Sequence, residues 1–247
     1  MDQEKQKLTQ NKFKLPYHWM RDPLHLGSLP YFGYAALVQG LLPPAPAAVL
    51  DMGCGDGRIA HELVQAGYRV TGLEFLAMSA QYASLLVPEG RFMQADLRQD
   101  LVADKGLAEA SFDAAILVEV YEHIPPADCP QVLANVVRVL KPGGRFIVSV
   151  PTKLVPMSNL HYRHFDPGQL EAELSAAGLT PQETVGQHRL GGFCGFLASP
   201  GLDRWLNNGI LEPVILKRLR RRLYQRTCNR AATGQACGRY IVAARKA

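Results

Sequence analysis

The sequence predicts an α/β fold, a doubly wound, mostly parallel sheet of seven strands with helices on both faces. Three observations lead to this prediction. From residue 47 onward, short β-branched runs alternate with helical patterns, the order that builds parallel sheets. The runs are almost continuously apolar, as strands buried on both faces are. The segment "GCGDG", residues 53–57, links the first run to the first helix, and its glycines permit a sharp turn.

The first five strands and the helices between them follow in order along the chain. Each strand is a short β-branched run, and the helical patterns are longer and end at stop signals. The predicted strands are 47–53, 68–75, 90–97, 112–120 and 144–150. The predicted helices are 56–67, 76–87 and 127–140. Gly67 ends the first helix, and Pro142 with Gly143 ends the third.

A further helix is predicted over 166–178, after the fifth strand and its loop. Asp166 suits the N-cap position and Pro167 the first helical position, and Gln169 completes a capping box. Phe165 precedes the cap and is expected to act as a hydrophobic staple. The last two strands are predicted over 180–188 and 238–246.

The length of 247 residues suits one α/β domain with appendages. We predict that this domain spans 45–188 and 238–247. Residues 1–44 are predicted to form an N-terminal lid or helical segment. Residues 189–237 are too many for a plain loop between two strands, so they are predicted to form a partly helical insertion before the last strand.

Composition argues against several classes of protein. The first 14 residues are polar and lack the apolar core of a secretory signal. The longest apolar stretch, 31–50, is broken by Pro43, Pro44 and Pro46, which argues against a membrane-spanning helix. The five cysteines form no CxxC pair, so neither a disulfide framework nor a zinc site is indicated, and the expected location is the cytoplasm.

The basic residues are concentrated in the predicted insertion. The chain carries a net charge of +5, yet residues 213–230 hold seven of its 27 Lys and Arg and none of its 22 Asp and Glu. Apolar residues recur there at helical spacing, namely Leu211, Ile215, Leu216, Leu219 and Leu223, with Trp205 upstream. Three interpretations stay open for residues 211–226: an amphipathic helix on an anionic membrane, a surface for RNA or another phosphate-rich ligand, and a packed helix with a solvated basic face.

The segment "VLDMGCGDG", residues 49–57, carries the strongest signal for a ligand. Gly53, Gly55 and Gly57 let the backbone approach a ligand closely, and the following helix offers free N–H groups. Glu74 lies about 20 residues further, at the end of the next strand, where a carboxylate can accept hydrogen bonds from ribose hydroxyls. Position 58 is arginine, so the dinucleotide fingerprint G-x-G-x-x-G is absent.

Five segments in order make the sequence resemble the class I S-adenosylmethionine-dependent methyltransferases, in the type 11-like branch related to quinone biosynthesis. They are "VLDMGCGDG", "VTGLEF", "QADL", "FDAAILVEVYEHI" and "LKPGGRFIVSVP". The resemblance implies a Rossmann-like domain, methyl-transfer activity and S-adenosyl-L-methionine as cofactor. It covers roughly residues 45–180 and the terminal "GRYIVAARK", and it does not specify the acceptor.

The resemblance also assigns cofactor roles to nine residues. Asp51 and the backbone of Gly53, Cys54 and Gly55 would hold the methionine part. Glu74 would bind both ribose hydroxyls, with Phe75 beside the adenine. Asp96 would bind the adenine amino group, with Leu97 near the ring. Glu119 would border the methionine part and the point of methyl transfer.

Two loops are candidates for the acceptor side, because ligands of such sheets bind beyond the carboxyl ends of the strands. His123 of "EVYEH" is a candidate base or positioning group. In the cluster "HYRHF", residues 161–165, we expect His161 or His164 to face the acceptor and Arg163 to anchor a polar or anionic group; the alternative is a hydrogen-bonded loop clamp. A metal site is disfavoured here, since Asp166 is needed as a cap. Tyr17, His18 and Trp19 form either a lid or an apolar contact.

The sequence thus predicts methyl transfer to a small-molecule, lipid or glycan acceptor, most plausibly at oxygen. Two alternatives stay open, an RNA-directed methyltransferase that uses the basic insertion and a non-catalytic cofactor-binding partner subunit. The fourth strand is followed by "EVYE" rather than by an "NPPY"-type motif, which disfavours methylation of adenine nitrogens in nucleic acids.

Overall fold

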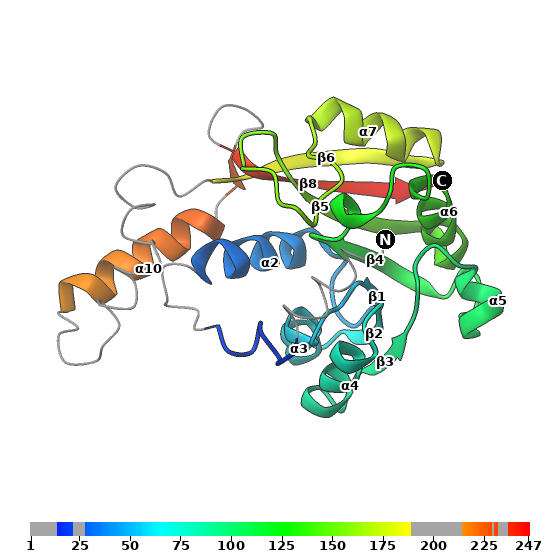
Figure 1. Ribbon diagram of the computed structural model, residues 1–247, viewed down its shortest axis with the longest axis horizontal. Helices are drawn as coiled ribbons and strands as arrows, with labels where there is room; N and C mark the ends of the chain where they lie inside the picture. Colours follow the sequence, from blue (N-terminus) through cyan, green and yellow to red (C-terminus); the bar gives the residue numbers. More distant parts are fainter. Residues whose placement is uncertain (1–13, 22–27, 189–213, 229, 232–236) are drawn as a thin grey trace.

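The computed structural model describes residues 14–21, 28–188, 214–228, 230–231 and 237–247, with the backbone alone for 214–220 and 231. Strands and helices alternate as the sequence predicts (Figure 1). The strands are β1 (Ala48–Met52), β2 (Arg69–Glu74), β3 (Arg91–Gln94), β4 (Phe112–Val118), β5 (Leu140–Pro151), β6 (Leu179–His188), β7 (Arg230–Ala231) and β8 (Cys237–Lys246). The helices are α2 (Leu29–Leu41), α3 (Arg58–Gln65), α4 (Ala77–Leu86), α5 (Leu101–Lys105), α6 (Cys129–Val139), α7 (Pro167–Ala176) and α10 (Val214–Cys228), with a 3-10 turn, η2, at Tyr121–His123.

The strands form one sheet in the order β3-β2-β1-β4-β5-β8-β6-β7. β1 to β5 pair in parallel, whereas β8 pairs antiparallel with both β5 and β6. The predicted doubly wound, mostly parallel sheet is therefore confirmed, and the short β7 extends it beyond seven strands. The carboxyl ends of β1, β2 and β4 lie at one edge, where such folds bind ligands.

Alternate residues of each central strand enter two separate cores. On β4, Ala115 and Leu117 pack in the core beneath α5, α6 and α7, whereas Ala114, Ile116 and Val118 pack in the core beneath α2 and α3. Successive side chains of a strand point to opposite faces. A strand buried on both faces is therefore apolar at every position, which explains the continuous apolar runs.

Three local predictions differ from the structure. β3 is shorter than the predicted 90–97, and the unpredicted α5 follows it. β5 begins at Leu140, before Pro142, because Leu140 pairs with Phe112 of β4. The capping box on α7 does not form, since the carboxylate of Asp166 pairs with Lys153 Nζ instead. The predicted hydrophobic staple is consistent with the structure, because Phe165 and Leu170 are both fully buried in one core.

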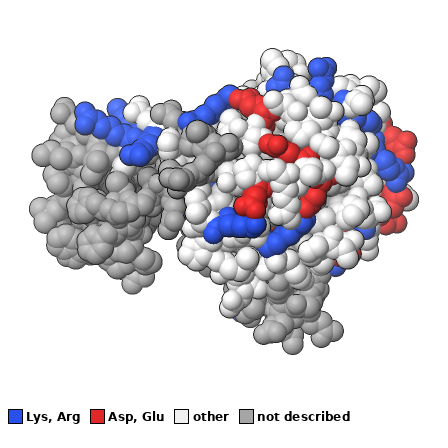
Figure 2. All heavy atoms as spheres, turned by 90° about the horizontal axis from the view of Figure 1, so that it is seen from above, with Lys and Arg blue, Asp and Glu red and all other residues white. Residues whose placement is uncertain are grey.

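The basic helix α10 lies beside α2 (Figure 1). Leu223 is buried, and Thr227 donates a hydrogen bond to the carbonyl of Leu29 at 3.3 Å. A Cβ on Gly33 of α2 would lie 2.6 Å from Thr227 Cβ, so glycine allows the close approach. Arg221, Arg222 and Arg226 are exposed, and Figure 2 shows this basic face of α10. The described half of α10 is thus a packed helix with a solvated basic face.

The other residues of the predicted apolar stripe are not described as side chains. Leu211 and Trp205 lie outside the described residues, as do the side chains of Ile215, Leu216 and Leu219. Within the described part of the chain, no helix is both long and apolar enough to cross a bilayer.

Candidate active site

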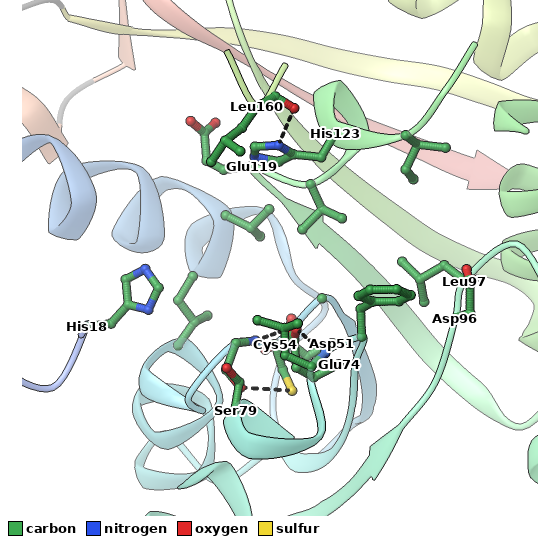
Figure 3. A pocket seen from close by; sticks show the side chains of 18 of the residues that line it. His18, Asp51, Cys54, Glu74, Ser79, Asp96, Leu97, Glu119, His123 and Leu160 are labelled. Carbon is green, nitrogen blue, oxygen red and sulfur yellow. Dashed lines mark hydrogen bonds between the residues drawn. The ribbon is translucent and has the colours of Figure 1, made fainter. Parts of the chain in front are cut away.

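A cavity of about 240 Å³ opens at the carboxyl ends of β1, β2 and β4 (Figure 3). All nine residues predicted to bind the cofactor line it: Asp51, Gly53, Cys54, Gly55, Glu74, Phe75, Asp96, Leu97 and Glu119. Of the four predicted catalytic residues, His123 lines it, whereas His161, Arg163 and His164 stand outside its wall.

The glycine-rich turn forms the floor of the cavity. Gly53 has φ +86°, and a Cβ there would lie 2.4 Å from Val120 Cγ2, so only glycine fits. The N–H groups of Gly53 and Cys54 both donate to the carbonyl of Leu73, at 2.7 and 3.0 Å. The turn is thereby fixed against β2, with its open side toward the cavity.

Asp51 presents a buried carboxylate to this cavity. Its side chain is 2% exposed, and Oδ2 has no hydrogen-bond partner. Burial, with a smaller contribution from nearby Glu74, raises the pKa of Asp51 to about 7. A buried oxygen without a partner is costly, and a cationic ligand would satisfy it. The site therefore fits the charge of the ammonium or sulfonium group of S-adenosylmethionine.

Glu74 is positioned by backbone N–H groups on both oxygens. Gly55 N–H donates to Oε2 at 3.0 Å, and Leu76 N–H donates to Oε1 at 2.9 Å. Burial raises the pKa of Glu74 despite these bonds. Each carboxylate oxygen has a second acceptor site, so the fixed carboxylate can still accept the two ribose hydroxyls.

Asp96 and Leu97 stand at the far end of the cavity (Figure 3). Arg98 Nε donates to Asp96 Oδ1 at 2.8 Å, and Arg98 NH2 approaches Oδ2 at 2.5 Å. Burial acts to raise the pKa of Asp96, but these bonds and the charge of Arg98 outweigh it, so the pKa is lowered. Asp96 is thus an ionised acceptor, and Arg98 is a lining residue that the motifs did not reveal.

The N-terminal segment 14–21 reaches the cavity, as the lid interpretation requires. His18 lines the cavity and stacks on Tyr31, with ring centroids 5.0 Å apart. Trp19 Nε1 donates to the carbonyl of Asp56 at 2.8 Å. Tyr17 is partly exposed and packs edge-on against His18. The placement of His18 favours the lid.

His123 is held at the upper end of the cavity, beside Glu119 (Figure 3). Its Nδ1 lies 3.1 Å from the carbonyl of Leu160. A carbonyl can only accept, so Nδ1 carries the proton and Nε2 is the basic nitrogen. The His161 ring packs edge-on against His123, with centroids 4.7 Å apart. His161 Nδ1 in turn contacts His164 Nε2 at 2.8 Å, and His164 is 5% exposed.

Arg163 clamps its own loop and does not line the cavity. Its guanidinium contacts both oxygens of Glu173, at 2.5 and 2.7 Å. Tyr121 donates to the same carboxylate at 2.9 Å, and the guanidinium lies 4.5 Å from the Phe165 ring centroid. The cluster "HYRHF" is thereby tied to the turn that carries His123. The expectation that Arg163 anchors a ligand is not supported, because Glu173 already neutralises it.

Glu122, His123 and His161 each offer a ligand atom, and these atoms lie within 4.8 Å of one another. Glu122 is 1% exposed, and burial, followed by the nearby charge of Glu119, raises its pKa well above the usual range. A protonated carboxyl beside two imidazoles also forms a hydrogen-bonding cluster without a metal. A metal-free site therefore stays a prediction.

Comparison with known proteins agrees with this geometry. Residues 50–148 match the model of a family described as a methyltransferase domain. Over 168 residues the chain is 31% identical to a ubiquinone biosynthesis O-methyltransferase from Xanthomonas axonopodis pv. citri (strain 306), covering 60% of this chain and 69% of that protein. The chain belongs to the S-adenosylmethionine-dependent methyltransferases. The predicted family and cofactor are thereby confirmed.

Two further comparisons extend the similarity, one in sequence and one in fold. A probable S-adenosylmethionine-dependent methyltransferase from Mycolicibacterium smegmatis (strain ATCC 700084 / mc(2)155) is 30% identical over 145 residues, which span 56% of this chain and about half, 54%, of that relative. A Burkholderia thailandensis 1,6-didemethyltoxoflavin-N1-methyltransferase, solved with its substrate and S-adenosylhomocysteine, has the same fold, with TM-score 0.56 and 22% identity over 98% of this chain and 89% of that one. Its fold alone does not assign an acceptor to the present methyltransferase.

The sequence did not reveal the lining residues that come from outside the motifs. Tyr31 and Tyr34 enter the cavity from α2, and Ser79 enters from α4. Arg239 of β8 binds Glu119 from behind the wall. Tertiary packing alone joins these elements, so periodicity and spacing gave no signal for these side chains.

Proposed function

We propose that this methyltransferase methylates a hydroxyl oxygen of a small organic acceptor, with His123 as the general base. The observation that carries the proposal is the position of His123, which lines the cavity while Nδ1 is held on the Leu160 carbonyl, so that Nε2 is its basic nitrogen. A hydroxyl must lose its proton as the new bond forms, and a positioned histidine suits that task.

The cofactor supplies an activated methyl group when bound. The chain's own residues supply position and charge. Asp51 and Glu74 hold the cofactor, His18 closes one side of the cavity, and Glu119 borders the end where the acceptor enters. These groups orient the acceptor and exclude water, which is the main protein contribution to a transfer of this kind.

Two observations support oxygen as the acceptor atom. A base is needed only for a protonated nucleophile, and His123 is placed to act as one. The relative with 31% identity is named as an O-methyltransferase of ubiquinone biosynthesis. Phenolic and quinol-type hydroxyls are therefore the first acceptors to test, ahead of glycan hydroxyls.

The test is turnover with a panel of acceptors. Purified protein with S-adenosylmethionine is offered catechols, hydroquinones, sugars, amines, thiols and total RNA, and S-adenosylhomocysteine and methylated products are followed by mass spectrometry. The expected result is methylation of a hydroxyl compound that is lost in His123→Gln. Methylation at nitrogen or sulfur only would contradict the proposal, and turnover that survives a chelator would support a metal-free site.

The same panel separates the alternatives. Tight binding of S-adenosylhomocysteine without turnover of any acceptor would favour the non-catalytic partner subunit. Methylation of RNA alone would favour the RNA-directed enzyme.

The basic helix α10 supports a second, independent proposal, attraction to anionic membranes that carry a lipid-linked acceptor. Arg221, Arg222 and Arg226 are exposed, whereas Leu223 is buried against the body of the protein. Leu223 is therefore not available for insertion, and the described half of the helix would bind lipid headgroups through charge, at about 1 kcal/mol per basic residue near the surface.

A further inference from the structure

Glu119 has a strained backbone at the end of the cavity that also holds His123 (Figure 3). Its φ is +55°, a left-handed conformation that a non-glycine residue keeps only where its surroundings hold it. Ser149 of β5 holds it there. The N–H of Glu119 donates to the Ser149 carbonyl and contacts its hydroxyl, both at 3.2 Å, and that hydroxyl donates to Glu119 Oε1 at 2.9 Å.

Arg239 of β8 binds the other carboxylate oxygen. Its Nε donates to Glu119 Oε2 at 2.6 Å, and the two side chains are 25% and 18% exposed. The guanidinium also lies 4.9 Å from the centroid of the Tyr34 ring, in a cation–π contact. One arginine therefore contacts a carboxylate from the residue after β4 and an aromatic ring from α2.

Glu119 and Tyr34 both line the cavity, whereas Arg239 stands behind them. The opposite end of the cavity is occupied by the cofactor-binding residues Asp96 and Leu97 (Figure 3). Glu119 and Tyr34 therefore belong to the acceptor end, together with His123. Within the described part of the chain, the Tyr34 hydroxyl has no hydrogen-bond partner, so it can bind a ligand.

We propose that Arg239 is a positioning residue that fixes Glu119 and Tyr34 as one acceptor-binding wall, and that this wall selects neutral hydroxyl compounds over anionic ones. The inference rests on the proposed function. Arg239 binds Glu119 from behind the wall, so the carboxylate is the charged group that the wall presents to the cavity. The remaining acceptor sites of the Glu119 carboxylate receive an acceptor O–H, and the Tyr34 hydroxyl binds a neighbouring oxygen. An anionic acceptor would instead bring a second carboxylate close to Glu119, which is unfavourable in a partly buried site.

The experiment compares two probes that share a pair of hydroxyls and differ in charge, neutral catechol and anionic protocatechuate. Their affinities for protein saturated with S-adenosylhomocysteine are measured by calorimetry. We expect wild type to bind catechol about tenfold more tightly, because one unpaired charge near a buried carboxylate costs on the order of 1.4 kcal/mol. Arg239→Gln should lose this catechol affinity about tenfold, and Arg239→Lys should restore part of it.

A double-mutant cycle separates positioning from a merely structural role. Because Arg239 acts largely through Glu119, Arg239→Gln should cost much less catechol affinity in the Glu119→Gln background than in wild type. S-adenosylhomocysteine affinity of Arg239→Gln should stay within about threefold of wild type, less than 1 kcal/mol. Arg245→Gln, on the same strand and exposed, is the matched control and should bind both probes as wild type does.

Each outcome decides the inference. Equal catechol affinity in wild type and Arg239→Gln, or additive effects in the cycle, would overturn it while leaving hydroxyl methylation intact. Wild type that neither binds the probes nor methylates any hydroxyl compound would overturn the proposed function as well. If Arg239→Gln fails to fold, Tyr34→Phe and Arg239→Lys carry the test: unchanged catechol binding in both would refute the wall.

Discussion

Asp56 of the glycine-rich turn holds His18 of the N-terminal segment at two points. The His18 N–H donates to Asp56 Oδ2 at 2.7 Å, and the His18 ring Nδ1 lies 3.1 Å from Oδ1. Asp56 is buried, and a Cβ added to its neighbour Gly55 would lie 3.7 Å from the His18 ring. The segment 14–21 is thus attached directly to the turn that binds the cofactor.

His18→Ala should therefore weaken cofactor binding about fivefold. It removes the ring contact with Asp56 and the stacking on Tyr31 but keeps the backbone bond, a loss of about 1 kcal/mol. Calorimetry with S-adenosylhomocysteine measures it. Tyr82→Phe is the control, because it removes a hydrogen bond to the Lys14 carbonyl at the far end of the segment. Equal affinities in all three proteins would show that the segment does not cover the cofactor.

Glu74→Ala should weaken cofactor binding about 100-fold, because two ribose hydrogen bonds to a charged group are lost, on the order of 3 kcal/mol. The same calorimetry measures it. Glu62→Ala, which removes an exposed carboxylate paired with Arg58, should leave the affinity unchanged. Unchanged affinity in Glu74→Ala would refute the ribose assignment.

Asp51→Asn should stabilise the protein without cofactor at pH 8 and leave it unchanged at pH 4. Because the pKa of Asp51 is raised to about 7, the folded state holds this proton more tightly than the unfolded state. Stability therefore falls as pH rises from about 4 to about 7, by up to a few kcal/mol. Thermal unfolding at both pH values measures the difference. Parallel curves for wild type and variant would contradict the raised pKa.

The same carboxylate makes cofactor binding depend on pH. A cationic ligand favours ionised Asp51, so wild-type affinity for S-adenosylmethionine should rise as pH increases through about 7 and then level off. In Asp51→Asn this dependence should disappear and the affinity should be lower at pH 8.

His123→Gln should lower kcat about 100-fold or more, the usual contribution of a general base. Replacing both His161 and His164 by Ala should lower kcat less, about tenfold, if they act by supporting the His123 ring. The pH profile of turnover separates the two cases, since only the His123 variant should lose its acidic limb. Full turnover in the double variant would remove both histidines from the chemistry.

Reversing charge at Arg220, Arg221 and Arg222 should abolish binding to anionic vesicles at low salt, because the basic face supplies the attraction. Flotation with phosphatidylglycerol vesicles measures it, and neutral vesicles are the control. The side chain of Arg220 lies outside the described residues, so Arg221 and Arg222 are also changed as a pair. Wild type that ignores anionic vesicles would refute the membrane proposal.

The cofactor end of the site follows from local sequence. Gly53, Asp51 and Glu74 belong to strand ends and to the turn that joins β1 to α3, so short-range spacing places them. In a parallel sheet the carboxyl ends of neighbouring strands meet at one edge, and this brings Asp51 and Glu74 to the same cavity. Family resemblance then names the ligand.

The acceptor end does not follow from local sequence. Arg239 binds Glu119 across 120 positions, and Tyr34 joins them only because α2 packs over the sheet. The cluster "HYRHF" shows the same limit. Its composition left both ligand contact and a loop clamp open. Glu173 of α7, ten residues after Arg163, binds the Arg163 guanidinium and so forms the clamp.

The sequence by itself determined the alternation of strands and helices and the family, and it picked out the predicted cofactor residues that line one cavity. Periodicity and short motifs act over a few residues, which is why they sufficed for these features. The tertiary structure decided which further side chains line the cavity, which ones clamp the loops beside it, and how the N-terminal segment meets the glycine-rich turn. Each of these outcomes depends on residues that are far apart in the sequence, because they pair charges and fill buried positions. Such residues meet only when the two cores pack.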